Sequence, residues 1–216
     1  MTAIKRQFVD GPFGQIHVRV AQCKGPTNEP PLVMLHMFPQ SGRNFVDVMP
    51  LLAERRTVIA PDFPGFGESD PPLRQISAEQ YAGAIWAVLE KLDIESGPVD
   101  LFGIHAGAKL AVEATAQKHN AVRRLALCSA AILTPEEVAE YWAVLRKIPL
   151  DRAGSRFETF WKMQADYLGP DAPLDLIAML FQEMQRGGES YHWGHAAVFD
   201  YNELCLERVR SLEHPI

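Results

Sequence analysis

Gly103, His105 and Gly107 form the pattern in this 216-residue chain with the clearest chemical meaning. They follow the apolar segment Val99–Phe102 and open an alanine-rich segment that ends near Lys118. A strand that enters a helix through Gly-x-His-x-Gly must turn sharply, and the small neighbours leave room for a strained central residue. Such a turn lifts the central side chain above the sheet, where a serine nucleophile is usual. Here an imidazole takes that position.

The imidazole of His105 is open to three interpretations. It attacks an acyl carbon itself if the ring is neutral and its lone pair faces the substrate. It acts as a general base on a bound water. Or it occupies the nucleophile position of a site that has lost its activity. We favour lost activity, or a chemistry that does not require serine, over ordinary ester hydrolysis.

Two backbone N–H groups are candidate donors to an oxyanion. The turn directs the N–H of Ala106 to the start of a helix, where negative charge is stabilised. The segment His36-Met37-Phe38-Pro39 follows another apolar run, and its loop presents the N–H of Phe38 to the same anion. The alternative is a plain loop whose histidine, His36, is satisfied by the backbone. Beside the turn at His105 we favour the two-donor site.

A third loop, Pro61–Asp70, carries two glycines two residues apart, which permit a sharp backbone path. It lacks the third glycine of a dinucleotide-binding loop and the Lys-Ser/Thr of a phosphate loop. We interpret it as a structural turn in which Asp62 accepts hydrogen bonds from backbone amides. The sequence predicts no cofactor and no metal site.

Short apolar segments and helical segments alternate along the first 130 residues. This order predicts a mostly parallel sheet covered on both faces, after an opening hairpin. Expected strands are 7–10, 15–21, 32–35, 57–60, 99–102 and 125–128; expected helices begin at the capping box of Ser77 and Gln80 and at Ala106. Beyond residue 133 we expect only helices: one after Thr134-Pro135, then 157–167, 174–185 and Ala196–Arg210.

In order and spacing, these three loops resemble the α/β-hydrolase superfamily, above all its lidded esterases, haloalkane dehalogenases and haloperoxidase-like enzymes. The resemblance implies an α/β fold, with a sheet core over 1–132, a helical lid over 133–211 and the start of a missing core strand at 212–216. It gives His105 the nucleophile's place and Phe38 and Ala106 the oxyanion hole. It implies structural roles for the remaining residues Gly103, Gly107, His36 and Asp62.

The resemblance also implies a catalytic acid and base after the last strands of the family, and the segment Leu212–Ile216 resembles only the approach to those strands. We therefore expect a hydrolase by family, of small apolar ester- or acyl-type substrates, whose serine-type catalysis is impaired. Two alternatives stay open: a non-catalytic small-ligand-binding protein and an interaction module that completes a partner. Whether the chain is an enzyme is left undecided.

Composition and charge restrict the cellular location and the binding partners that we expect. The net charge of −6 argues against nucleic acid, no apolar run has membrane-spanning length, and the N-terminal segment lacks a signal peptide's apolar stretch. Cys23, Cys128 and Cys205 are odd in number and far apart, which is typical of free thiols in a reducing compartment. We predict a cytoplasmic protein. For the apolar sheet edge at Arg124–Ser129 we expect one of three outcomes: self-association into a dimer or larger assembly, an edge covered by the lid or tail, or a poorly soluble fragment.

Overall fold

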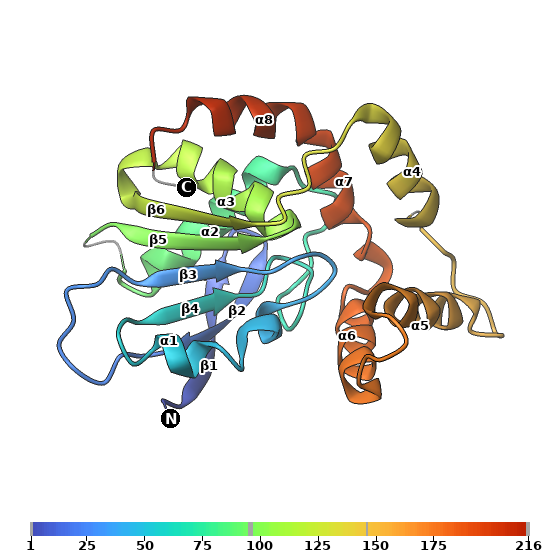
Figure 1. Cartoon of the computed structure of the whole chain (residues 1–216), viewed down its shortest axis with the longest axis horizontal. Helices are drawn as coiled ribbons and strands as arrows, with labels where there is room; N and C mark the ends of the chain where they lie inside the picture. The colour runs from blue at the N-terminus through green and yellow to red at the C-terminus, as the bar shows by residue number, and fades with distance from the viewer. Residues whose placement is uncertain (1, 95–96, 146, 215–216) are drawn as a thin grey trace.

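The computed structural model describes residues 2–94, 97–145 and 147–214 (Figure 1). Six strands form one sheet in the order β1-β2-β4-β3-β5-β6. The strands are β1 (Ile4–Gly11), β2 (Gly14–Ala21), β3 (Leu32–Leu35), β4 (Val58–Pro61), β5 (Val99–Ile104) and β6 (Val122–Cys128). All six strands lie where the sequence predicted them.

The sheet is mixed but mostly parallel. β1 pairs with β2, and β2 with β4, in antiparallel fashion, whereas β3 pairs in parallel with both β4 and β5, and β5 with β6. The carboxyl ends of β3, β4, β5 and β6 therefore meet at one edge of the sheet. The α/β fold class predicted from the sequence is confirmed.

Successive strand residues contribute to different faces of the sheet, as the pleat requires. Val33, Leu35 and Ile59 belong to a large core cluster with α2 (Ala78–Lys91) and α3 (Ala106–Gln117). Their neighbours in sequence Met34, Val58 and Ala60 belong to a second cluster with the short helices η1 (Gly42–Phe45) and α1 (Met49–Leu52). Both faces are thus covered, because these buried strands are apolar on both sides. The predicted capping box of Ser77 and Gln80 starts α2.

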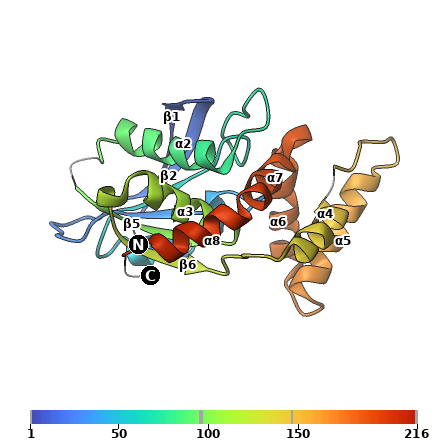
Figure 2. The ribbon, with the colours of Figure 1, turned by 90° about the horizontal axis from the view of Figure 1, so that it is seen from above.

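Three helices lie away from the sheet, beyond the carboxyl ends of the parallel strands (Figures 1 and 2). We call α4 (Pro135–Leu145), α5 (Ser155–Leu168) and α6 (Leu174–Arg186) the helical block. Phe160 and Met184 of this block form a small core with Tyr191, which follows α6 in the sequence. None of the helices in the described ranges is long and apolar enough to cross a membrane.

The prediction of one helix over Ala196–Arg210 is wrong. The segment forms α7 (Trp193–Asp200) and α8 (Asn202–Ser211), and α8 packs along α3 (Figure 2). The carbonyl of Val198 would accept from the N–H of Asn202 in one continuous helix, but it accepts from the Nζ of Lys109 at 3.1 Å. A side chain inserted into the hydrogen-bond ladder is a common cause of a helix break.

After α8, residues 212–214 lie outside any strand, and the Nε2 of His214 donates to the carbonyl of His119 at 3.0 Å. Pro215 and Ile216 lie outside the described residues. The core strand expected to start at 212–216 therefore stays a prediction.

Candidate functional site

His105 lies between β5 and α3 with a backbone conformation that non-glycine residues rarely adopt, φ 50° and ψ −114°. Its N–H donates to the carbonyl of Cys128 at 2.9 Å, which ties the end of β5 to the end of β6. Its own carbonyl accepts from the N–H of Ala108 at 3.0 Å, so α3 begins without a connecting loop. Strain of this kind persists only where the surrounding structure enforces it.

Gly103 and Gly107 enforce this strained conformation, because they let neighbouring backbone segments approach one another closely. A Cβ on Gly103 would lie 2.3 Å from the carbonyl oxygen of Gly107, and a Cβ on Gly107 would lie 2.1 Å from the carbonyl oxygen of Leu35. Carbon and oxygen cannot approach so closely without displacing backbone. The N-terminus of α3 therefore lies directly on β5 and β3 because both positions lack a side chain.

His36 is fully buried at the end of β3 and is held in one tautomer. Its Nε2 accepts from the N–H of Phe63 at 2.9 Å, so its Nδ1 carries the proton and donates to the carbonyl of Met37 at 2.8 Å. Burial lowers the pKa of His36, which keeps the ring neutral. The imidazole thus links the loop after β3 to the loop after β4.

Asp62 is fully buried at the start of the loop after β4 and accepts four hydrogen bonds. Two come from backbone amides, of Gly42 at 2.8 Å and of Glu68 at 3.0 Å. The other two come from the side chains of His17 and Arg19, each at 2.9 Å. Burial by itself would raise the pKa of Asp62, but the hydrogen bond to His17 and the charge of Arg19 outweigh it and hold that pKa low. The carboxylate ties three chain segments together.

The two candidate oxyanion donors come from neighbouring loops. Leu35 pairs with Gly103, so the loop that contains Phe38 starts beside the turn that contains Ala106. The side chains of Phe38 and Ala106 belong to the same buried cluster. Within the described residues, neither N–H donates a hydrogen bond. Whether both point at one anion stays a prediction.

The imidazole of His105 has no hydrogen-bond partner in the part of the chain that the structure describes. No carboxylate or second histidine is bonded to it there. His195, which the sequence analysis did not count among the site residues, lies beside Phe38, and burial lowers its pKa to about 4. The rings of His195 and Phe38 lie 6.3 Å apart. Only the fold shows this contact, since 157 positions separate the two residues.

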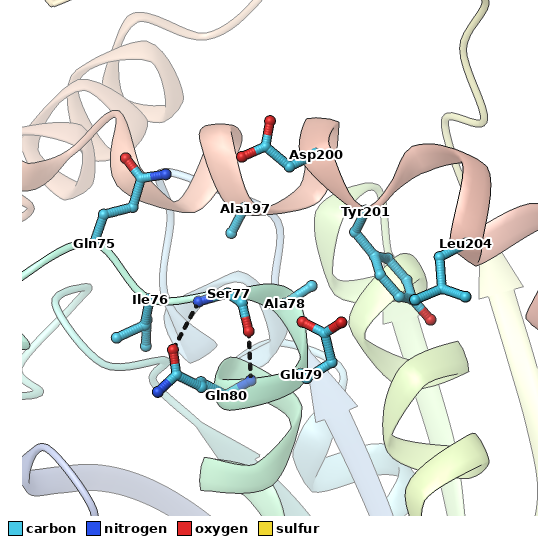
Figure 3. Close-up of a pocket in the computed structure, with 10 residues that line it drawn as sticks. All are labelled: Gln75, Ile76, Ser77, Ala78, Glu79, Gln80, Ala197, Asp200, Tyr201 and Leu204. Carbon is cyan, nitrogen blue, oxygen red and sulfur yellow. Dashed lines mark hydrogen bonds between the residues drawn. The ribbon is translucent and has the colours of Figure 1, made fainter.

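A cavity of about 400 Å³ lies between the start of α2 and the helices α7 and α8 (Figure 3). Gln75 to Gln80 line one side and Ala197, Asp200, Tyr201 and Leu204 the other. A second cavity, of about 410 Å³, lies between α5 and α6. His105 lines neither of them. The described residues contain no cluster of three histidine, cysteine or acidic side chains that would hold a metal ion.

Comparison with protein families gives one match: the family described as "alpha/beta hydrolase fold" matches residues 30–161. Among curated proteins, a soluble epoxide hydrolase of Corynebacterium sp. is 34% identical over 95 residues, which cover 44% of this chain and 32% of that protein. A 2-hydroxymuconate semialdehyde hydrolase of Pseudomonas sp. is 38% identical over 112 residues, covering 47% and 36%. The matched region thus spans about a third of either relative.

Solved structures match over more of the chain. An N-acyl homoserine lactonase bound to N-butanoyl homoserine superposes with a TM-score of 0.75 at 22% identity, covering 99% of this chain and 76% of that one. An esterase of Thermogutta terrifontis superposes with a TM-score of 0.69 at 20% identity, covering 93% and 75%. At such low identity these structures establish the fold and nothing finer.

Proposed function

Since the chain belongs to the alpha/beta hydrolase fold family, we propose that it binds small apolar ester- or acyl-type compounds at the turn of His105 and that its serine-type catalysis is impaired. The observation that carries the proposal is the strained backbone of His105 at the end of β5, with an imidazole that has no acid or base bonded to it in the described residues. Two of the relatives, a soluble epoxide hydrolase and a 2-hydroxymuconate semialdehyde hydrolase, are hydrolases of small molecules by name, which supports a small-molecule hydrolase.

In this proposal each residue has one role. The N–H groups of Phe38 and Ala106 bind the carbonyl oxygen, and His105 faces the acyl carbon. Gly103, Gly107, His36 and Asp62 hold the loops that carry these groups. Residues 1–132 form the core, and residues 133–211 cover the site as a lid. No metal or cofactor takes part.

Hydrolysis of chromogenic short-chain esters tests the catalytic part of the proposal. We expect slow hydrolysis by the wild-type protein that falls to the background rate in His105→Ala, because the imidazole is the only reactive side chain assigned to the turn. His119→Ala is the matched control, since this exposed histidine lies at the far end of α3. Fast hydrolysis that survives His105→Ala would contradict the proposal.

Restoring serine tests the impairment. We expect His105→Ser to gain no fast hydrolysis, because no histidine is bonded to position 105 in the described residues and a lone serine hydroxyl is a weak nucleophile. A fluorophosphonate probe should leave residue 105 of the wild-type protein unlabelled. Fast turnover by His105→Ser would show that an acid and a base do reach the turn.

A non-catalytic role is the second candidate, favoured by the two backbone donors without partners. In that case the protein holds a small carbonyl or carboxylate compound and does not convert it. Calorimetric titration with butyrate distinguishes the two, because saturable binding without any ester turnover by the wild-type protein supports the binding role alone.

We also propose that the protein is cytoplasmic and self-associates through the edge strand β6. All three cysteines are free, which fits a reducing compartment. Within the described residues β6 pairs only with β5, and Arg124, Ala126 and Cys128 are exposed on it. An unpaired edge is a template for a second strand. Light scattering after size-exclusion chromatography should give a mass above that of one chain, and a monomer at high concentration would contradict this.

A further inference from the structure

We propose that α6 and α7 position the loop that carries the N–H of Phe38, with Glu183 and His195 as its positioning residues. The inference rests on the proposed function, because it assumes that this N–H receives the carbonyl oxygen of a bound compound. It adds that the oxyanion site is complete only while α6 is docked on the loop.

The first contact is a buried carboxylate of α6. Glu183 is only 3% exposed, and its Oε2 accepts from the hydroxyl of Ser41 at 2.5 Å. Its Oε1 accepts from Nη1 of Arg43 at 3.3 Å, and Nε of Arg186 lies 3.5 Å from the same oxygen. A carboxylate buried this deeply needs such partners, because an unpaired one would lose its hydration without compensation. Undocking α6 therefore exposes Glu183 and breaks all its bonds to the loop.

The hydroxyl of Ser41 has a second task within the loop. Its oxygen accepts from the N–H of Arg43 at 3.1 Å and so caps η1. The same hydroxyl donates to Glu183, which fixes the direction of its proton. Beside it, Nε2 of Gln40 donates to the carbonyl of Leu180, also on α6, at 3.4 Å. Docked α6 thus contacts three loop residues within six positions of Phe38.

α7 contacts Phe38 itself. A Cβ on Gly194 would lie 2.7 Å from Cδ2 of the Phe38 ring, so the bare backbone of α7 packs against that ring. On the next residue, the ring of His195 lies edge-on to the Phe38 ring, with the centroids 6.3 Å apart. Phe66 stacks on the Phe38 ring with the centroids 4.4 Å apart. Contacts from α7 and from Phe66, in the loop after β4, therefore hold the aromatic ring of Phe38 from outside its own loop.

These contacts matter because much of the loop lacks regular structure. Residues 36–41 belong to no helix or strand. The N–H of Gln40 donates to the carbonyl of Met37 at 3.0 Å, and side-chain contacts add to this turn in setting where the N–H of Phe38 points. Docking of α6 and formation of the oxyanion site are then coupled equilibria. A compound that binds the Phe38 N–H must favour the docked state, and removing the docking contacts must therefore lower the affinity for that compound.

Hydrogen exchange tests the positioning without any need for activity. In Glu183→Ala we expect amides of residues 36–45 to exchange about tenfold faster or more, the factor that corresponds to one lost charged hydrogen bond. Amides of β3 and β5 should keep their protection. Glu183→Gln retains an acceptor for Ser41 and should fall between Ala and wild type. Glu158→Ala, an exposed carboxylate on α5, is the matched control and should leave the loop unchanged.

Unchanged exchange at 36–45 in Glu183→Ala would overturn the inference. If Glu183→Ala does not fold, Ser41→Ala removes the same hydrogen bond from the other side and gives the same readout.

A binding experiment distinguishes failure of this inference from failure of the proposed function. With butyrate as the probe, we expect Gly194→Ala and Glu183→Ala to raise the Kd of the wild-type protein about tenfold, because both changes move the Phe38 loop. Wild-type protein that neither binds butyrate nor hydrolyses esters contradicts the proposed function, while the exchange experiment still decides the positioning. Tight binding by wild type with an unchanged Kd in both variants contradicts the inference alone.

Discussion

The turn at His105 and the helical block are held in place by different kinds of interaction. At the turn, backbone lies on backbone: Gly103 and Gly107 leave no space for even a Cβ. The block has a three-residue core and reaches the sheet domain through polar side chains such as Glu183 and Arg186. Phe157, Trp161, Tyr167 and Leu174 of the block stay exposed.

This difference indicates which part of the site adjusts. Steric fit at close range has no low-energy alternative, so the turn keeps its geometry or the fold fails. Partly exposed ion pairs such as that of Arg186 with Glu68 contribute little each and are exchanged for water at low cost, whereas the buried Glu183 makes a stronger contact. Motion that admits a ligand should therefore take place in the block, against a fixed turn.

The largest expected effect comes from filling the closest contact of the turn. Gly107→Ala should lower the free energy of unfolding by about 3 kcal/mol or more, because its Cβ meets the carbonyl oxygens of Leu35 and His36. Urea unfolding measures the change. Gly25→Ala, where a Cβ meets nothing within 4 Å, is the control and should change stability by less than about 0.5 kcal/mol. A small effect at Gly107 would show that the turn also adjusts.

The next effect concerns Lys109, buried between α3 and α8. Burial lowers its pKa to about 8, from 10.5 in the unfolded chain. Between these values the unfolded chain binds more protons, so stability should rise from pH 8 to 10.5 by up to about 3 kcal/mol.

The matched variant is Lys109→Met, whose stability should not rise in this way between pH 8 and 10.5. Burial raises the pKa of Cys205 to about 11, and above pH 9 this thiol acts in the opposite direction. The prediction is therefore the difference between wild type and variant in denaturant melts. Parallel pH profiles of the two proteins would refute it.

Asn202 joins the two regions, since its side chain bonds to both the N–H and the carbonyl of Leu133, where the chain enters the block. Asn202→Ala should cost about 1–3 kcal/mol, because it leaves the Leu133 amide without its partner. We expect faster hydrogen exchange at 130–134 with little change in β3. The exposed Asn120→Ala serves as control, and equal stability of both variants would argue against this role.

The smallest effect should come from the ion pair of Arg186 with Glu68, both 39% exposed. Glu68→Ala, which leaves Arg186 beside Glu183, should cost less than about 1 kcal/mol, and the cost should shrink in high salt. Thermal melts at low and high sodium chloride concentration measure it. A large effect that does not depend on salt would mean that the block is bound as firmly as the turn.

Local patterns determined most of the fold. Apolar runs located the six strands, and the capping box of Ser77 and Gln80 located the start of α2, because both signals lie within a few residues. The division of Ala196–Arg210 into α7 and α8 was missed. Its cause, the bond from Lys109 to the Val198 carbonyl, joins residues 89 positions apart.

For the candidate site, too, local sequence patterns determined one part and long-range packing determined the other. The sequence by itself determined that residue 105 occupies a strained turn, since glycine spacing governs local backbone geometry. Only the tertiary structure decided that Glu183 contacts Ser41 and His195 lies beside Phe38 in the neighbouring loop, and that the His105 imidazole has no hydrogen-bond partner in the described residues. These depend on how distant segments pack, and a polar side chain's partner is set by packing across the fold, not by its neighbours in sequence.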